Sequence, residues 1–267
     1  MLFVRTLTFN ALFTFATAIL SLAATPWLLM PYRAAIWYKQ LWLHIVLGLT
    51  RLVIGIDCEE RGRENIPDGP VIFAAKHQSA WDTLWLGLKH PFCAFVLKRE
   101  LIWLPIWGWY LLRLGMIPID RSKGVASLKK ITVAAGKLTG RGQSILIFPQ
   151  GTRTPPGADR RYLPGVAAIY KGANVPVVPI ALNSGLFWPR KLMHKQPGII
   201  TVEYLEPIEP GLDRKTFMKV LEERIEPVTA RLEAEALERF PYLPRLSPET
   251  AEPGPGPKPA KTDARAV

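Results

Sequence analysis

The amino-acid sequence begins with an uncharged segment that is long enough to cross a lipid bilayer. No charged residue occurs between Thr6 and Tyr32, a run of 27 residues. The part of this run before Pro26 would form a helix of roughly 30 Å, which matches the hydrocarbon thickness of a bilayer. A cleaved signal peptide is the alternative interpretation, because Ser21-Leu22-Ala23 places small residues after an apolar run that follows Arg5.

A second apolar segment favours a retained membrane anchor over a cleaved signal. The apolar character of residues 36–56 is broken only by Lys39, His44 and Arg51. Tryptophan and tyrosine side chains surround Lys39, an arrangement typical of helices that lie at a membrane interface. We therefore expect residues 1–57 to form a membrane anchor of two apolar helices.

Beyond a polar segment at residues 63–70, short apolar runs alternate with helical patterns. The apolar runs predict strands because each lies near a glycine or proline; they cover residues 71–75, 92–97, 116–119, 144–148, 177–182 and 199–204. Helices are predicted over residues 79–88, 122–138, 164–171 and 214–240. This alternation indicates an α/β domain with a mostly parallel central sheet flanked by helices, which we place at residues 58–240. The proline-rich residues 241–267 are predicted to be a disordered tail.

The positive charge of the chain is concentrated in its middle third. The formal net charge is +12, and residues 89–171 contribute +11, from fourteen basic and three acidic residues. Such an excess indicates an anionic partner: nucleic acid, a phosphorylated substrate or an acidic membrane surface. Nucleic acid is disfavoured because no helix-turn-helix or zinc-finger spacing occurs. Two cysteines and four scattered histidines give no metal-binding pattern, so we expect no metal site.

A histidine and an aspartate follow the first predicted strand of the α/β domain. His77 and Asp82 would not share a face of one continuous helix, because residues five apart lie about 140° apart. They can meet if His77 lies in the loop and Asp82 in the first helical turn. The carboxylate would then hold the Nδ1 proton and leave Nε2 as a general base. In the alternative, Ser79 and Asp82 only cap the helix and His77 has no role.

Two further strands end in an arginine. Gly151, Thr152 and Arg153 follow the predicted strand 144–148, and Arg121 follows the predicted strand 116–119. A guanidinium group can bind two oxygens of a phosphate, and glycine permits close approach of the backbone. Two such strand ends indicate a phosphate site, although each arginine taken alone could be an ordinary surface residue.

Four blocks in one order resemble the 1-acyl-sn-glycerol-3-phosphate acyltransferase family. They are His77-x4-Asp82; Lys98-Arg99-Glu100-Leu101 with Pro105, Gly108 and Ile119-Asp120-Arg121; Phe148-Pro149-Gln150-Gly151-Thr152-Arg153; and Val175-Pro176-Val177-Val178-Pro179-Ile180. The resemblance covers residues 60 to about 185 and implies the glycerolipid acyltransferase fold.

The resemblance implies transfer of a fatty acyl group to the sn-2 hydroxyl of 1-acyl-sn-glycerol-3-phosphate, giving phosphatidate. The donor would be the thioester of acyl-CoA or acyl-carrier protein, used as a co-substrate without a cofactor. His77 and Asp82 would form the catalytic pair. The acceptor phosphate would bind Arg121, Gly151, Thr152 and Arg153, with possible support from Gln150, Lys98 and Pro179. The apolar residues 101–114 would lie near lipid chains, and the domain would face the cytoplasm at the inner leaflet.

Two positions depart from the family pattern, which usually has asparagine before the histidine and glutamate before the Gly-Thr-Arg sequence. Here Lys76 and Gln150 occupy these positions. Gln150 retains hydrogen-bonding capacity but has no charge, which argues against an essential acid at that position. We expect the Lys76 side chain to point toward solvent or phosphate. Other acceptors, such as a lyso-amino-acid lipid, and a non-catalytic protein that binds polyanions at a membrane surface stay open as alternatives.

Overall fold

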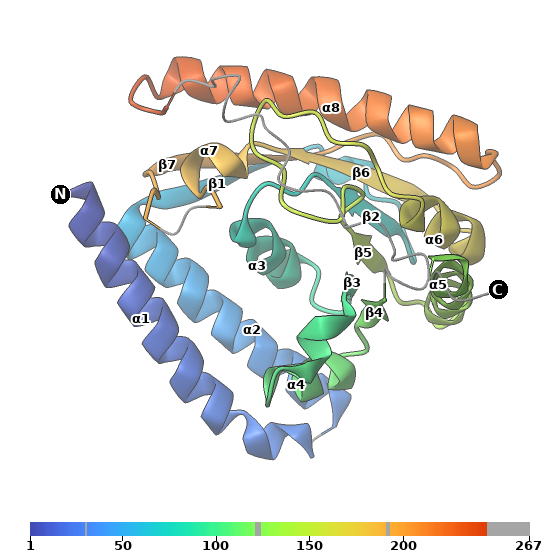
Figure 1. Cartoon of the computed structure of the whole chain (residues 1–267), viewed down its shortest axis with the longest axis horizontal. Coiled ribbons are helices and arrows are strands. Elements are labelled where there is room, and N and C mark those ends of the chain that lie inside the picture. Colours follow the sequence, from blue (N-terminus) through green and yellow to red (C-terminus); the bar gives the residue numbers. More distant parts are fainter. Residues whose placement is uncertain (30, 121–123, 191–192, 245–267) are drawn as a thin grey trace, which may run out of the picture.

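In the computed structural model, the described residues 1–29, 31–120, 124–190 and 193–244 contain a seven-stranded sheet (Figure 1). Its strand order is β1-β7-β6-β2-β5-β3-β4, and every neighbouring pair is parallel except β6 with β7. The strands are β1 (Ile56–Arg61), β2 (Ile72–Ala75), β3 (Ala94–Lys98), β4 (Ile117–Ile119), β5 (Ile145–Ile147), β6 (Val177–Leu182) and β7 (Gly198–Tyr204). The predicted mostly parallel α/β fold is confirmed.

Alternate residues of the central strands point to opposite faces of the sheet, and both faces are buried. Phe73, Leu146 and Val178 are paired neighbours that pack on one face, with α3 (Ala80–Lys89) and the N-terminal helices. Ile72 and Ile145 pack on the other face, with α5 (Gly124–Thr139), α6 (Gly165–Ala173) and α8 (Arg214–Arg239). Strands covered on both faces have apolar residues at nearly every position, which made them recognisable in the sequence.

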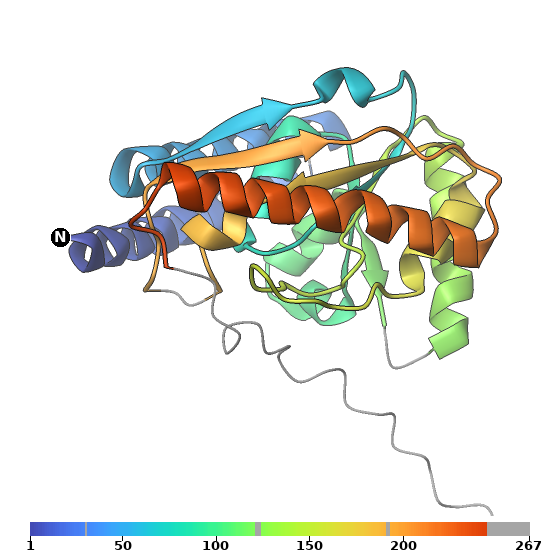
Figure 2. The same ribbon diagram turned by 90° about the horizontal axis from the view of Figure 1, so that it is seen from above.

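Helix α8 is the longest helix of the described chain and lies along the sheet on the side opposite α3 (Figures 1 and 2). Asp213 caps its first turn by accepting hydrogen bonds from the backbone nitrogens of Lys215 and Thr216, at 2.8 and 3.1 Å. Phe217, Leu221 and Ile225 recur at intervals of four and are fully buried. The helix therefore buries one apolar stripe against the sheet and leaves other faces for charged residues.

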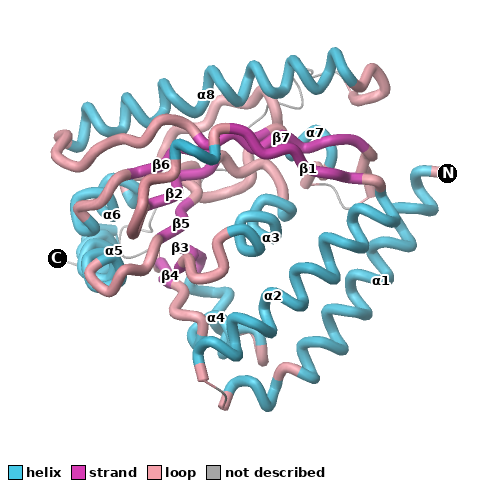
Figure 3. The backbone as a smooth tube through the Cα atoms, turned by 180° about the vertical axis from the view of Figure 1, so that it is seen from behind, coloured by secondary structure: helices cyan, strands magenta, loops and turns pink. Residues whose placement is uncertain are grey.

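The N-terminal segment forms two helices, α1 (Leu2–Ala23) and α2 (Tyr32–Leu49). They pack against each other and lie beside α3 (Figure 3). Among the described residues, α1 is the helix long and apolar enough to span a membrane. Most of α1 is exposed, but Phe9 is fully buried and meets the ring of Trp188 edge-on at 5.2 Å. The pair is therefore attached to the α/β domain by specific packing.

Three elements of the structure were not predicted. β1 is an edge strand whose mostly polar sequence has no apolar alternation, and β7 alone holds it in the sheet. α4 (Trp107–Arg113) lies within the stretch predicted only to be apolar, and α7 (Ser184–Phe187) is a single buried turn after β6. Of the predicted tail, residues 241–244 are described, and Leu243 is buried against the core. Residues 245–267 lie outside the described part of the chain.

Candidate active site

The parallel strands bring the candidate residues to one edge of the sheet. β2 ends at Ala75 and its neighbour β5 ends at Ile147, so the loops that follow them leave the sheet side by side. The first loop carries His77, and the second carries Gly151 and Arg153. The carboxyl ends of parallel strands are the usual location of ligand sites in α/β folds.

His77 and Asp82 are in direct contact. The imidazole Nδ1 lies 2.9 Å from Asp82 Oδ2, with His77 in the loop and Asp82 in the first turn of α3. An ionised carboxylate can only accept a hydrogen bond, so Nδ1 carries the proton and Nε2 has a free lone pair. The geometry is that of a histidine oriented to act as a base.

Asp82 also caps α3, so the two interpretations of this motif are compatible. Its Oδ2 accepts hydrogen bonds from the backbone nitrogens of Gln78 and Ser79, at 2.8 and 2.9 Å, and its Oδ1 accepts one from the Ser184 hydroxyl. The Ser79 hydroxyl completes a capping box. Asp82 is fully buried. Four donors thus stabilise a buried carboxylate and fix its position against His77.

The His77 ring is held between the loop and a neighbouring aromatic side chain. It stacks on Phe148 with ring centroids 3.9 Å apart, and 14% of the His77 side chain is exposed. The backbone nitrogen of Thr154 donates to the carbonyl of His77 at 2.7 Å. The histidine loop and the Gly151-Arg153 loop therefore hold each other in place.

A cavity of about 1070 Å³ opens beside His77. One part of its lining is cationic or polar and the other is apolar. The polar lining includes the cations Lys39, Lys98, Arg153, Arg160 and Arg190, the acids Glu100 and Asp120, and Gln150, Gly151 and Thr152. The apolar lining comes mainly from α1, α2, α3, β3, α4 and α5, and includes Leu20, Trp42, Leu84, Phe95, Tyr110, Leu114, Met116 and Ile131. A phosphate and a hydrocarbon chain would each find matching surface in this cavity.

The loop after β5 brings cationic side chains of the cavity lining near one another. Gly151 has φ 68°, a left-handed conformation that glycine adopts without strain and that turns the chain after β5. Arg153 is partly buried, and burial, followed by the charge of Arg190, lowers the pKa of its guanidinium. Among the described residues, no carboxylate forms an ion pair with Arg153, Arg160 or Arg190. Neighbouring cations of this kind favour an anionic ligand.

Most of the candidate residues meet at this cavity, and some do not. His77, Lys98, Gln150, Gly151, Thr152 and Arg153 line it. Asp82 lies behind His77, and Pro179 lies inside β6, paired with Ala74, outside the lining. Arg121 lies outside the described residues. Gln150 is buried, and its Oε1 has no hydrogen-bond partner within the described chain. Arg160 and Arg190 were missed because no motif marks them.

The expected orientation of Lys76 is wrong. Its side chain points away from solvent and is 2% exposed, and its Nζ lies 2.5 Å from Glu226 Oε2 of α8. A buried ammonium group is stable only with a partner, and Glu226 lies 150 positions away in the sequence. The positive charge beside His77 is therefore neutralised by α8.

The chain is similar in sequence to known proteins. Residues 57–183 match a family model described as Acyltransferase. A 1-acyl-sn-glycerol-3-phosphate acyltransferase of Pseudomonas aeruginosa is 42% identical over 176 residues, which cover 65% of this chain and 68% of that protein. One of Limnanthes alba is 30% identical over 185 residues, which cover 68% of this chain and 64% of that protein.

The fold also has a solved relative. The crystal structure of the 1-acyl-sn-glycerophosphate acyltransferase from Thermotoga maritima superimposes with a TM-score of 0.70 at 22% identity, covering 88% of this chain and all of that one. The Pseudomonas protein is similar enough, over enough of its length, to show the family of this chain. The family model covers the loop that carries His77 (the histidine loop) and the loop that carries Arg153 (the arginine loop). The chain belongs to the 1-acyl-sn-glycerol-3-phosphate acyltransferase family.

Proposed function

We propose that this protein transfers a fatty acyl group from a thioester to the sn-2 hydroxyl of 1-acyl-sn-glycerol-3-phosphate, producing phosphatidate. The observation that carries the proposal is the His77–Asp82 pair at a cavity with one cationic and one apolar part. The names of the relatives support the same reaction.

In the proposed reaction His77 is the general base. Its Nε2 takes the proton of the acceptor hydroxyl while the oxygen attacks the thioester carbonyl. The carbon–sulfur bond then breaks, and the thiolate leaves and takes the proton from the imidazolium. Asp82 stabilises the transient imidazolium through Nδ1. No acyl-enzyme forms and no cofactor takes part.

The acceptor phosphate would bind the cationic lining of the cavity. Arg153 would supply two hydrogen bonds to phosphate oxygens, and the loop at Gly151 and Thr152 would approach them closely. Arg160 and Arg190 add charge, and Lys98 and Gln150 add donors from the same lining. We keep Arg121 in this set as a prediction from the sequence.

The apolar lining and the anchor would bring lipid substrates to the site. Leu20, Tyr38 and Trp42 of the anchor helices contribute to the same cavity as His77. An acyl chain could thus pass from the membrane into the cavity without crossing water. We place the α/β domain on the cytoplasmic side, where acyl-CoA and acyl-carrier protein are available as donors.

An acceptor panel tests this proposal. The purified full-length protein is incubated with acyl-CoA or acyl-carrier protein thioester, and thiol release and lipid product are measured together. We expect phosphatidate from 1-acyl-sn-glycerol-3-phosphate at a higher kcat/KM than any product from monoacylglycerol, lysophosphatidylcholine or a lyso-amino-acid lipid. A preference for one of the other acceptors, or no transfer to any, would overturn it.

A further inference from the structure

Helix α8 contacts the histidine loop from the side opposite the cavity. Glu226 accepts a hydrogen bond from Lys76 Nζ at 2.5 Å with one oxygen and from the Tyr162 hydroxyl at 2.7 Å with the other. Lys76 directly precedes His77, and Tyr162 belongs to the segment that follows the arginine loop. One carboxylate of α8 therefore connects both segments of the site.

A second carboxylate of the same helix repeats this arrangement. Glu233 Oε1 accepts a hydrogen bond from Gln78 Nε2 at 2.6 Å, and its Oε2 accepts one from the backbone nitrogen of Gly157 at 3.0 Å. Gln78 Oε1 in turn accepts a hydrogen bond from the backbone nitrogen of Gly185 at 3.0 Å. Gln78 directly follows His77, so the two carboxylates hold the residues on either side of the histidine.

The spacing on α8 explains how one helix can do this. Glu226 and Glu233 are seven residues apart, which is close to two turns, so both project from one face of the helix. Glu233 is 5% exposed, and its burial raises the pKa of its carboxyl. A buried carboxylate costs free energy unless its hydrogen bonds are all made, and here both oxygens are occupied.

We infer that Glu226 and Glu233 are positioning residues for the acyl transfer: they fix the His77 loop and the arginine loop relative to each other. Neither carboxylate lines the cavity. They act through Lys76, Gln78, Tyr162 and Gly157, at the back of the two loops. The inference rests on the proposed function, because it concerns the geometry between the proposed base and the proposed phosphate site. Displacements of about 1 Å in such a geometry can cost about 10² in rate.

The Glu233→Gln variant tests this inference with almost no change of shape. Glutamine has one acceptor oxygen, whereas Gln78 Nε2 and the Gly157 nitrogen both need an acceptor. Turning the Gln78 amide over does not help, because its NH2 group would then face the Gly185 nitrogen. We expect kcat to fall about 10- to 100-fold, while the melting temperature stays high enough for assay of the folded enzyme.

The reciprocal exchange provides a rescue. In the double variant Gln78→Glu/Glu233→Gln, the new glutamine donates to the new carboxylate and accepts from Gly157, and the carboxylate still accepts from Gly185. All three hydrogen bonds and the net charge are retained. We expect kcat to return to within about threefold of wild type, with the Gln78→Glu single variant impaired because two carboxylates then face each other.

The control is Glu235→Gln on the same helix. Glu235 is more exposed and pairs with Arg61 and Arg231, away from both loops. We expect its kcat to equal that of wild type. The inference is overturned if folded Glu233→Gln retains kcat within about twofold, or if the folded double variant stays as slow as the single variants.

Failure of the inference is distinguishable from failure of the proposed function. All rates are divided by the wild-type rate on the acceptor that wild type uses best. A wild type inactive on 1-acyl-sn-glycerol-3-phosphate but active on another acceptor overturns the proposed substrate and leaves the ratios measurable.

Discussion

At the scale of the residue, Asp82 shows how one side chain can serve both folding and the proposed chemistry. Its Oδ2 accepts both the backbone hydrogen bonds that begin α3 and the hydrogen bond that orients His77. The motif is short because the Asp82 carboxylate must reach both His77 in the loop and the backbone nitrogens at the start of α3. His77 and Asp82 therefore belong to the start of the helix as much as to the site.

Replacement of Arg153 by alanine tests the proposed phosphate site at this scale. Charge-assisted hydrogen bonds contribute about 1.5–3 kcal/mol, so kcat/KM for the phosphate-bearing acceptor should fall about 10- to 100-fold. The loss for monoacylglycerol, which has no phosphate, should be small. Arg214→Ala, at an exposed position of α8, is the matched control and should leave both acceptors unaffected. Equal losses for the two acceptors would contradict the assigned role.

At the scale of the element, the features that depend on a short stretch of sequence were predicted correctly. Buried strands such as β2 and β6 have continuous apolar runs, and the loops after them carry compact motifs, so both were predicted. β1 was missed because an edge strand needs little apolar sequence. Glu226 and Glu233 could not be assigned, since a polar helix face has the pattern of a solvated surface. The orientation of Lys76 was wrongly predicted because its partner, Glu226, is distant in the sequence.

A buried lysine joins α1 to the α/β domain and allows a prediction for this contact. Lys195 is fully buried, its Nζ lies 2.8 Å from Asn10 Oδ1, and it lies 5.2 and 4.9 Å from the ring centroids of Phe9 and Trp188. Burial lowers the pKa of Lys195 from 10.5 to about 8. The unfolded chain therefore binds this proton more tightly than the folded protein between these two pH values.

Because stability rises with pH wherever the unfolded state binds more protons, wild type should gain stability as the pH rises from about 8 to 10.5. Below this range both states are protonated and the penalty of the buried charge is constant. The measurement is the free energy of urea unfolding in detergent, compared with Lys195→Met, which cannot titrate. A difference between the two proteins that stays the same over this pH range would contradict the prediction.

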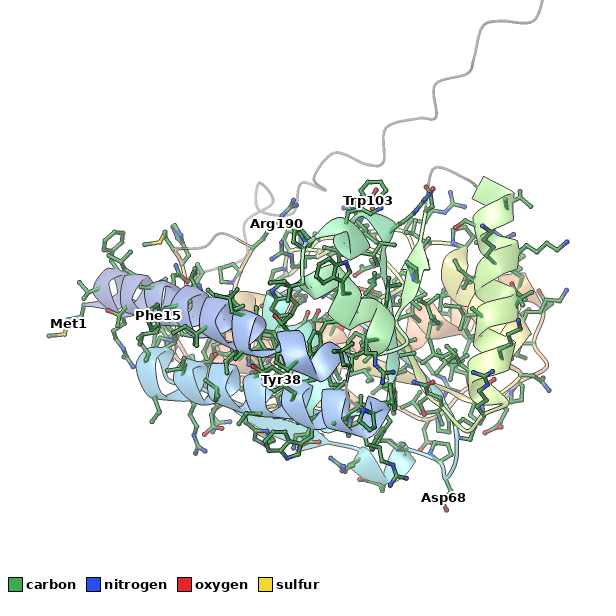
Figure 4. All side chains as sticks on the ribbon, turned by 90° about the horizontal axis from the view of Figure 1, so that it is seen from below. Met1, Phe15, Tyr38, Asp68, Trp103 and Arg190 are labelled. Atoms are coloured by element: carbon green, nitrogen blue, oxygen red, sulfur yellow. The ribbon has the colours of Figure 1, made fainter. Side chains whose placement is uncertain are left out.

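At the scale of the whole molecule, exposed apolar side chains lie both on α1 and on the part of the domain that encloses the cavity. Phe15 of α1 is 66% exposed. Trp103, shortly before the cavity-lining α4, is 67% exposed, and Trp109, within α4, is 56% exposed. Figure 4 looks onto the two anchor helices and shows Phe15 on α1 and Trp103 at the outer surface. These side chains extend the apolar surface of α1 to the part of the domain that encloses the cavity, so that lipid chains would have a short path to His77.

Substitution of Phe15 by glutamate tests this arrangement. A buried phenylalanine contributes about 1.5–3 kcal/mol, so loss of its contact with lipid should lower binding to vesicles about tenfold or more. Val133→Glu, at an exposed apolar position of α5 far from α1 (Figure 1), is the control. Co-sedimentation with vesicles measures both variants. Equal binding of the two would mean that α1 does not contact the membrane through this face.

The proposed reaction depends on His77 as the base, and the His77→Ala variant tests this role. Purified full-length His77→Ala is compared with wild type for acyl transfer from acyl-CoA to 1-acyl-sn-glycerol-3-phosphate, with folding verified by circular dichroism. General-base catalysis is worth about 10² to 10⁴ in rate, so kcat should fall by at least about 100-fold while KM for the acceptor changes little. A folded His77→Ala protein that transfers acyl groups at a rate near wild type would contradict the role of His77 as the base.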